Sequence, residues 1–86
     1  MKDQELLQNI VCELVNVPED VRIEKTIDDM GILLTLHVNP RDMGVLLGRK
    51  GETITAIRKI MKPVGFKHGS RISIKVHDPN YQNNYQ

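Results

Sequence analysis

Residues 46–57 read LLGRKGETITAI, and this stretch decides how the chain folds. Two glycines, Gly48 and Gly51, enclose the basic pair Arg49 and Lys50, and aliphatic residues lie on both sides. The apolar spacing on each side is helical, so we expect a short helix, a tight loop and a second helix. Glycine at both ends of the loop lets another backbone approach closely, because glycine has no Cβ atom.

The loop also carries the charge that a phosphate-binding site needs. Amides at the start of the following helix have a partial positive charge, and Arg49 and Lys50 add two full charges at the same place. These features predict a clamp that holds a nucleic-acid backbone and leaves the bases free to be read beside it. The alternative, a merely solvated turn, does not account for the flanking glycines.

The N-terminal part predicts a helix followed by a hairpin. Apolar residues recur at helical spacing over 3–15, with Asp3 as a suitable N-cap. Two strand-like runs, 21–27 and 32–38, flank a turn at 28–31. An antiparallel hairpin is the simplest arrangement of these two runs.

The segments around the loop predict two further helices. Residues 39–42 read NPRD, in which an Asn cap and Pro are followed by Asp42 at a capping-box position. They open the short helix at 43–47. The helix after the loop is expected over 52–62, because Pro63 disfavours helical geometry at the residue before it.

The C-terminal part predicts a loop over 64–70, a strand over 71–76 and a disordered polar tail over 78–86. The order of elements is therefore α-β-β-α-α-β. A strand, two helices and a strand form a right-handed crossover between parallel strands. We expect an α+β domain over residues 1–77, with a three-stranded mixed sheet and three helices packed on one face.

Composition and charge exclude several classes of protein. The 86 residues have room for one domain, and no apolar run approaches the roughly 18 residues of a membrane span. The start, MKDQELLQNI, lacks the pattern of a signal peptide, and Cys12 has no second thiol, so we expect a cytoplasmic protein without membrane contact. The net charge is only +1, but residues 41–75 carry nine basic and two acidic side chains, a net charge of +7. Such a segment can bind a polyanion.

We expect no enzyme, cofactor, metal site or small-molecule substrate. His37, His68 and His77 fall on two strands and a loop, with no nucleophile or carboxylate at the spacing of a catalytic triad or metal site. The glycines in and before the loop form neither a P-loop nor a dinucleotide-binding fingerprint.

Residues 46–57 resemble the KH-domain signature, in which two aliphatic residues precede a Gly-X-X-Gly loop and spaced aliphatic residues follow it. The additional N-terminal helix and strand make residues 3–77 resemble the type II KH fold. Met43-Gly44 and the basic loop pair make the chain most similar to the small bacterial KH proteins of the KhpA type. The resemblance implies binding of about four nucleotides of single-stranded RNA, with the loop on the backbone and an apolar groove beneath the bases.

The resemblance also assigns roles to individual residues. The positions that match the loop and the aliphatic groove are Gly48, Arg49, Lys50, Gly51, Leu46, Leu47 and Ile54. For the three aliphatic residues, plain packing in the core is a slightly favoured alternative.

The helix at 52–62 has two flanks beside its core stripe. One flank carries Thr55, Arg58, Lys59 and Lys62, and this basic flank, with Arg58 and Lys59 as the main candidates, is predicted to extend the phosphate-binding surface. On the other, Ile60 and Ala56 are candidate contacts with a partner subunit, because the resemblance implies dimerisation. An isoleucine at the edge of the core is an equally good alternative for Ile60.

The function predicted is single-stranded RNA binding of modest affinity and low sequence specificity, because Phe66 is the only aromatic residue outside the tail. The family implies an RNA chaperone or post-transcriptional regulator that acts with a partner, as a homodimer or as a heterodimer with a larger KH-containing protein. The alternative is a KH-fold protein–protein adaptor with little intrinsic RNA affinity. A duplex-DNA binder is a weaker third possibility, since no base-reading helix is evident.

Overall fold

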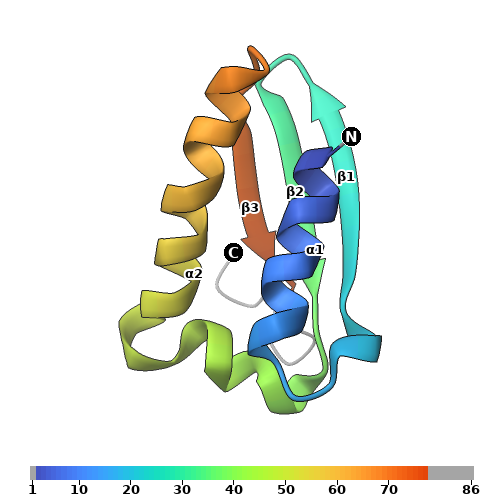
Figure 1. Cartoon of the computed structure of the whole chain (residues 1–86), viewed down its shortest axis with the longest axis vertical. Helices are drawn as coiled ribbons and strands as arrows, with labels where there is room; N and C mark the ends of the chain where they lie inside the picture. Colours follow the sequence, from blue (N-terminus) through green and yellow to red (C-terminus); the bar gives the residue numbers. More distant parts are fainter. Residues whose placement is uncertain (1, 78–86) are drawn as a thin grey trace, which may run out of the picture.

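The computed structural model describes residues 2–77 and consists of a sheet with helices on one side (Figure 1). The tail predicted over 78–86 lies outside the described residues. Two short 3₁₀ turns, η1 and η2, accompany the helices and strands. The elements are α1 (Lys2–Leu14), η1 (Pro18–Asp20), β1 (Arg22–Asp28), β2 (Gly31–His37), η2 (Pro40–Asp42), α2 (Met43–Lys67) and β3 (Ile72–Val76).

The sheet has the expected mixed topology. Its strands lie in the order β1-β2-β3, with β1 antiparallel and β3 parallel to β2. In this register Leu36 lies between Ile23 on one neighbour and Val76 on the other. The α+β class and the three-stranded mixed sheet are therefore confirmed, and β3 is an edge strand next to α2.

One face of the sheet carries the core. Side chains alternate along each strand, so that every second residue of β2 points toward α1 and α2. The other face of the sheet is open and carries polar side chains such as Glu24 and Lys75. The most deeply buried apolar residues of the core are Leu7, Val11, Leu34, Leu36, Leu46, Ile57 and Met61.

The helix after the loop is longer than the sequence predicts. The expected end at Lys62 is wrong, because α2 continues through Pro63 to Lys67. Pro63 is exposed, so the carbonyl that loses its hydrogen-bond partner faces water at low cost. Tertiary packing favours the extra turn: Gly65 is buried so closely against β3 that a Cβ atom there would lie 3.1 Å from Ile72 Cγ1.

The three expected helices appear as two elements. Both helices that flank the loop belong to α2, and only residues 48–51 depart from helical geometry within it. The helix predicted to begin after Asp3 begins at Lys2, so Asp3 lies inside α1 and is not its N-cap. Asp3 is instead buried, with its Oδ1 atom 3.7 Å from Nζ of Lys25 on β1.

The segment before α2 ties the two helices together. As predicted, Asn39 acts as an N-cap: it precedes η2, and its side chain accepts a hydrogen bond of 2.9 Å from the Arg41 amide. Asp42 does not form the predicted capping box. Its fully buried carboxylate accepts hydrogen bonds from the amides of Asn16 and Val17, both at 3.0 Å, and from Asn16 Nδ2 at 3.2 Å. This carboxylate fixes the start of α2, and with it the loop, relative to the end of α1.

Candidate nucleic-acid interface

The loop at residues 48–51 has an unusual backbone. Gly48 is extended (φ −67°, ψ 165°), and the three residues after it are left-handed: Arg49 (φ 53°), Lys50 (φ 62°) and Gly51 (φ 73°). Only Gly51 adopts this conformation without strain, whereas the left-handed backbone has a strain energy of about 1–2 kcal/mol at each of the two basic residues. Strain of this kind persists at binding sites, where the surrounding structure holds it in place.

Two glycines near the loop are not required by the fold. A Cβ atom on Gly44 or on Gly48 would meet no other atom within 4 Å, and neither residue has a positive φ. Gly44 also lies in a helix, where glycine costs about 1 kcal/mol relative to alanine. Both glycines line a crevice of about 350 Å³ together with Arg49 and Glu52. The crevice therefore leaves bare backbone open to whatever binds there.

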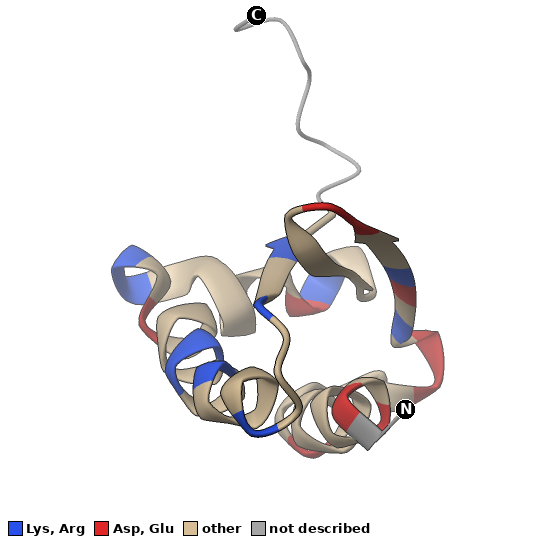
Figure 2. Cartoon of the chain, turned by 90° about the horizontal axis from the view of Figure 1, so that it is seen from above, with Lys and Arg blue, Asp and Glu red and all other residues tan. Residues whose placement is uncertain are grey.

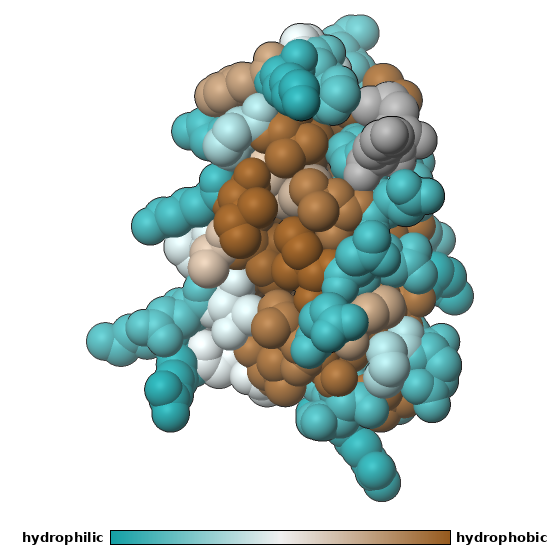
Figure 3. Space-filling model, in the orientation of Figure 1, coloured by the Kyte–Doolittle hydropathy of each residue, from teal (hydrophilic) through white to brown (hydrophobic). Residues whose placement is uncertain are grey.

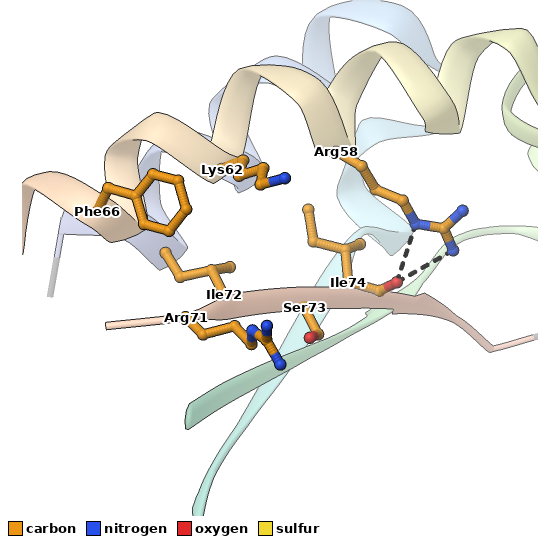
Figure 4. Close-up of a pocket in the computed structure, with 7 residues that line it drawn as sticks. All are labelled: Arg58, Lys62, Phe66, Arg71, Ile72, Ser73 and Ile74. Atoms are coloured by element: carbon orange, nitrogen blue, oxygen red, sulfur yellow. Dashed lines mark hydrogen bonds between the residues drawn. The ribbon is translucent and has the colours of Figure 1, made fainter. Parts of the chain in front are cut away.

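A groove runs between the second half of α2 and the edge strand β3 (Figure 4). Its volume is about 470 Å³. Three cationic side chains and one aromatic ring surround a floor of aliphatic and polar β3 residues. The lining residues are Arg58, Lys62, Phe66, Arg71, Ile72, Ser73 and Ile74.

Arg58 is held along this groove by the edge strand. Its Nε and Nη2 atoms donate to the carbonyl oxygen of Ile74 at 3.2 and 3.1 Å. Three guanidinium N–H donors, two on Nη1 and one on Nη2, are not used by this carbonyl. Arg58 therefore both closes part of the sheet edge and presents a positive charge beside it.

The free edge of β3 offers main-chain groups for recognition. On the side that faces β2, the Arg71 carbonyl accepts a hydrogen bond from the Ile32 amide at 2.7 Å, and the His77 amide donates one to the Leu36 carbonyl at 2.8 Å. Main-chain groups of successive strand residues point to opposite sides, so those of residues 72, 74 and 76 face outward. The Ile74 carbonyl is already bonded to Arg58, so the other outward groups are those that a ligand in the groove would meet.

Charge is distributed unevenly over the molecule. Figure 2 shows Lys and Arg gathered along α2 and carboxylates gathered on α1 and around β1. Glu52 is the exception beside the loop. The positive surface thus coincides with the loop and the groove.

On the open face of the sheet, His37 Nε2 lies 2.9 Å from Glu24 Oε1, and this hydrogen bond and the charge of His37 lower the pKa of the Glu24 carboxyl.

The predicted site residues do not all lie at this surface. The loop residues and Arg58 do, and Lys59 is exposed but does not line the groove. Leu46 is fully buried and Ile54 is 3% exposed, so as packed they belong to the core, while Leu47 is 40% exposed. The basic flank predicted from the sequence included Lys62, which lines the groove, but sequence reasoning did not assign Phe66 to it, although Arg58, Lys62 and Phe66 recur every four residues on one helical face.

A second exposed surface lies on the opposite flank of α2. Ile60 is 51% exposed and Leu14 of α1 is 44% exposed. Together with Ala56 and Ile10 they line a shallow apolar groove between the helices. Figure 3 shows apolar side chains collected between α1 and α2 on this face. The sequence-based candidates Ala56 and Ile60 are thus brought together with residues of α1.

Other classes of site are not found in the described part of the chain. Within residues 2–77, no three His, Cys, Asp or Glu side chains gather where they could hold a metal ion. Nor does any helix in that range have the length and hydrophobicity to cross a bilayer.

Comparisons with known proteins give a consistent result. Residues 4–76 match the family model of the KhpA/KhpB KH domain. The RNA-binding protein KhpA of Clostridium perfringens is 33% identical over 73 residues, which cover 85% of this chain and 97% of that protein. The KhpA proteins of Mycobacterium leprae (35% over 68 residues; 79% and 84% covered) and Listeria monocytogenes (36% over 73 residues; 85% and 96% covered) are similar too. No solved structure matches the chain.

Proposed function

Because the chain belongs to the KhpA/KhpB family of KH domains, we propose that it binds single-stranded RNA through residues 48–51. The relatives from Clostridium, Mycobacterium and Listeria are each named RNA-binding proteins. KH domains hold about four nucleotides, with the Gly-X-X-Gly loop on the backbone of the strand. The basic loop and the groove beside it suit that mode of binding.

The observation that carries the proposal is the bare backbone at Gly48. The conformation of Gly48 suits any residue, and open space surrounds the position of its missing Cβ atom. The fold therefore has no use for glycine there. A ligand backbone that must approach the chain closely does have a use for it, and Arg49 and Lys50 make that ligand an anion.

The loop and the groove bind different parts of the RNA in this proposal. Phosphates lie against the loop amides and its two cations, and the bases enter the groove between α2 and β3. There they meet Arg58, at the end of the groove nearest the loop, and the outward main-chain groups of β3 that Arg58 leaves free. Main-chain groups discriminate weakly among bases, so we expect modest affinity and low sequence preference.

The apolar face formed by Ile10, Leu14, Ala56 and Ile60 is proposed to bind a second KH domain. It lies on the opposite flank of α2 from Arg58, so a partner leaves the groove open, but Glu52 and Thr53 line both this face and the crevice at the loop. The partner is a second copy of this chain or a larger KH-containing protein. Two linked domains hold two stretches of one RNA, which raises the affinity through a high effective concentration.

In the cell, we propose a cytoplasmic RNA chaperone or post-transcriptional regulator. Four clamped nucleotides carry little specificity, so the partner decides which RNAs are bound. The exposed apolar face also favours a second candidate, an adaptor that binds proteins and has little affinity for RNA. The positive loop argues against this alternative, because a protein adaptor does not need strained cations.

Chemical-shift mapping on the ¹⁵N-labelled chain tests the proposed site. A short single-stranded RNA is expected to shift the amides of residues 48–51, the second half of α2, and β3. Shifts confined to α1 or to the open face of the sheet would place the site elsewhere. An absence of shifts at millimolar RNA would favour the adaptor.

A further inference from the structure

Phe66 is an exposed aromatic ring at one end of the RNA groove. It is 66% exposed, although the residue before it, Gly65, is buried against β3. Figure 4 shows the ring above Ile72, at the opposite end of the groove from Arg58. A single exposed phenylalanine is common on protein surfaces and needs no explanation by itself. Its position within a positively charged groove is what calls for one.

The surroundings of the ring suit a nucleotide. Lys62 and Arg71 line the groove beside it. The Lys62 ammonium lies 5.9 Å from the ring centroid, at the outer limit of a cation–π contact, so it holds the ring weakly. An aromatic face flanked by cations is the arrangement with which proteins stack bases and neutralise their phosphates.

The distance from the loop places the ring beyond the clamped nucleotides. Phe66 follows Gly51 by 15 residues of α2, which corresponds to about 22 Å along the helix axis. Four nucleotides at the roughly 3.4 Å spacing of a stacked strand cover only about 14 Å. An RNA gripped by the loop therefore needs further nucleotides to reach the ring.

We propose that Phe66 is a stacking platform for a nucleobase outside the four clamped nucleotides, with Lys62 and Arg71 beside the phosphates that flank this base. The inference rests on the proposed function, since the loop must hold the strand for the ring to meet it. Every base has an aromatic face, so the platform adds affinity without sequence preference. It makes seven or more nucleotides, and not four, the length that this domain binds best.

The test compares single-stranded oligouridines of four, six and eight nucleotides on the full chain by fluorescence anisotropy. The wild type is expected to bind the eight-nucleotide RNA roughly tenfold more tightly than the four-nucleotide RNA. Phe66→Ala should remove that gain and flatten the length dependence of binding. Equal length dependence in the two proteins would overturn the inference.

A second variant gives a direct signal, because the chain contains no tryptophan. In Phe66→Trp, eight-nucleotide RNA is expected to quench the fluorescence of the introduced indole, and four-nucleotide RNA is not. Binding without any change in this fluorescence would overturn the inference. So would a changed oligomeric state of Phe66→Ala, which would place the ring in a protein contact.

The length series also separates this inference from the proposed function. If the wild type binds four nucleotides through the loop and Phe66→Ala behaves identically at all lengths, only the stacking platform is wrong. If neutral residues at Arg49 and Lys50 leave four-nucleotide binding intact, the loop is not the clamp and the proposed function fails first.

Discussion

Replacing Gly48 with alanine is expected to leave the fold intact and to weaken RNA binding. The backbone at Gly48 (φ −67°, ψ 165°) suits any residue, and its new methyl group would meet no atom within 4 Å. Alanine reduces the conformational entropy of the unfolded chain, which stabilises the protein by about 0.4–1 kcal/mol. For a domain of this size, that corresponds to a melting temperature higher by roughly 2–8 °C.

The same methyl group obstructs the ligand. It projects about 1.5 Å from the Cα atom, so a phosphate-bearing backbone can no longer reach the loop amides at hydrogen-bond distance. Loss of a charge-assisted hydrogen bond costs about 1.5–3 kcal/mol, which is roughly a 10- to 100-fold increase in Kd. Fluorescence anisotropy with a four-nucleotide RNA measures Kd, and thermal unfolding followed by circular dichroism measures stability.

Two other glycines serve as controls for Gly48→Ala. Gly51 (φ +73°) and Gly69 (φ +72°) both have left-handed backbones with no close neighbours. Alanine at either position should lower stability by about 1 kcal/mol, but only Gly51→Ala should also weaken binding. If Gly48→Ala is more stable and binds as tightly as the wild type, the reasoning about close approach is refuted. If Gly48→Ala is less stable than the wild type, the conclusion that the fold does not require glycine at this position is refuted.

Four further single variants and one double variant test other parts of the structure. Arg58→Ala should lower RNA affinity, and it should also lower the melting temperature because the Ile74 carbonyl loses its hydrogen bonds. Lys59→Ala should lower RNA affinity alone. If the double variant binds RNA with an unchanged salt dependence, the prediction that this basic flank contacts phosphates is wrong. Asp42→Asn should cost about 1–3 kcal/mol of stability in chemical denaturation, since a buried acceptor of three hydrogen bonds is replaced; an unchanged unfolding midpoint would contradict the positioning role. Ile60→Asp should give a folded monomer in sedimentation, and an unaltered oligomeric state would show that this face is not the interface.

Most of the fold could be predicted from local patterns. The alternation along β2 and the helical spacing around Leu7 specify which face of each element is buried, and the element order then leaves few topologies. The end of α2 could not be predicted in this way. The rule for Pro63 considers only the neighbouring backbone, whereas the packing of Gly65 against β3 stabilises the additional turn.

The site was predictable only in part, for a similar reason. The loop is contiguous in sequence, so its glycines and cations identify it directly. The groove joins α2 to β3, and its members become visible only when the two elements are placed side by side. Leu46 and Ile54 match the family pattern, yet their burial shows that matching positions can belong to the core.

The most direct test of the central claim is the salt dependence of RNA binding by an Arg49→Asn/Lys50→Asn variant. Asparagine tolerates the left-handed backbone of both positions, so the variant should fold at least as well as the wild type. The matched control, Arg22→Gln/Lys75→Gln, removes the same charge from the open face of the sheet.

If the loop clamps the RNA, binding by the loop variant falls at least tenfold and the slope of log K against log salt decreases by about 1.4, or 0.7 for each lost phosphate contact. The control keeps nearly the slope of the wild type. Equal slopes and affinities in the loop variant and the control would contradict the account, because binding would then depend on overall charge and not on this loop.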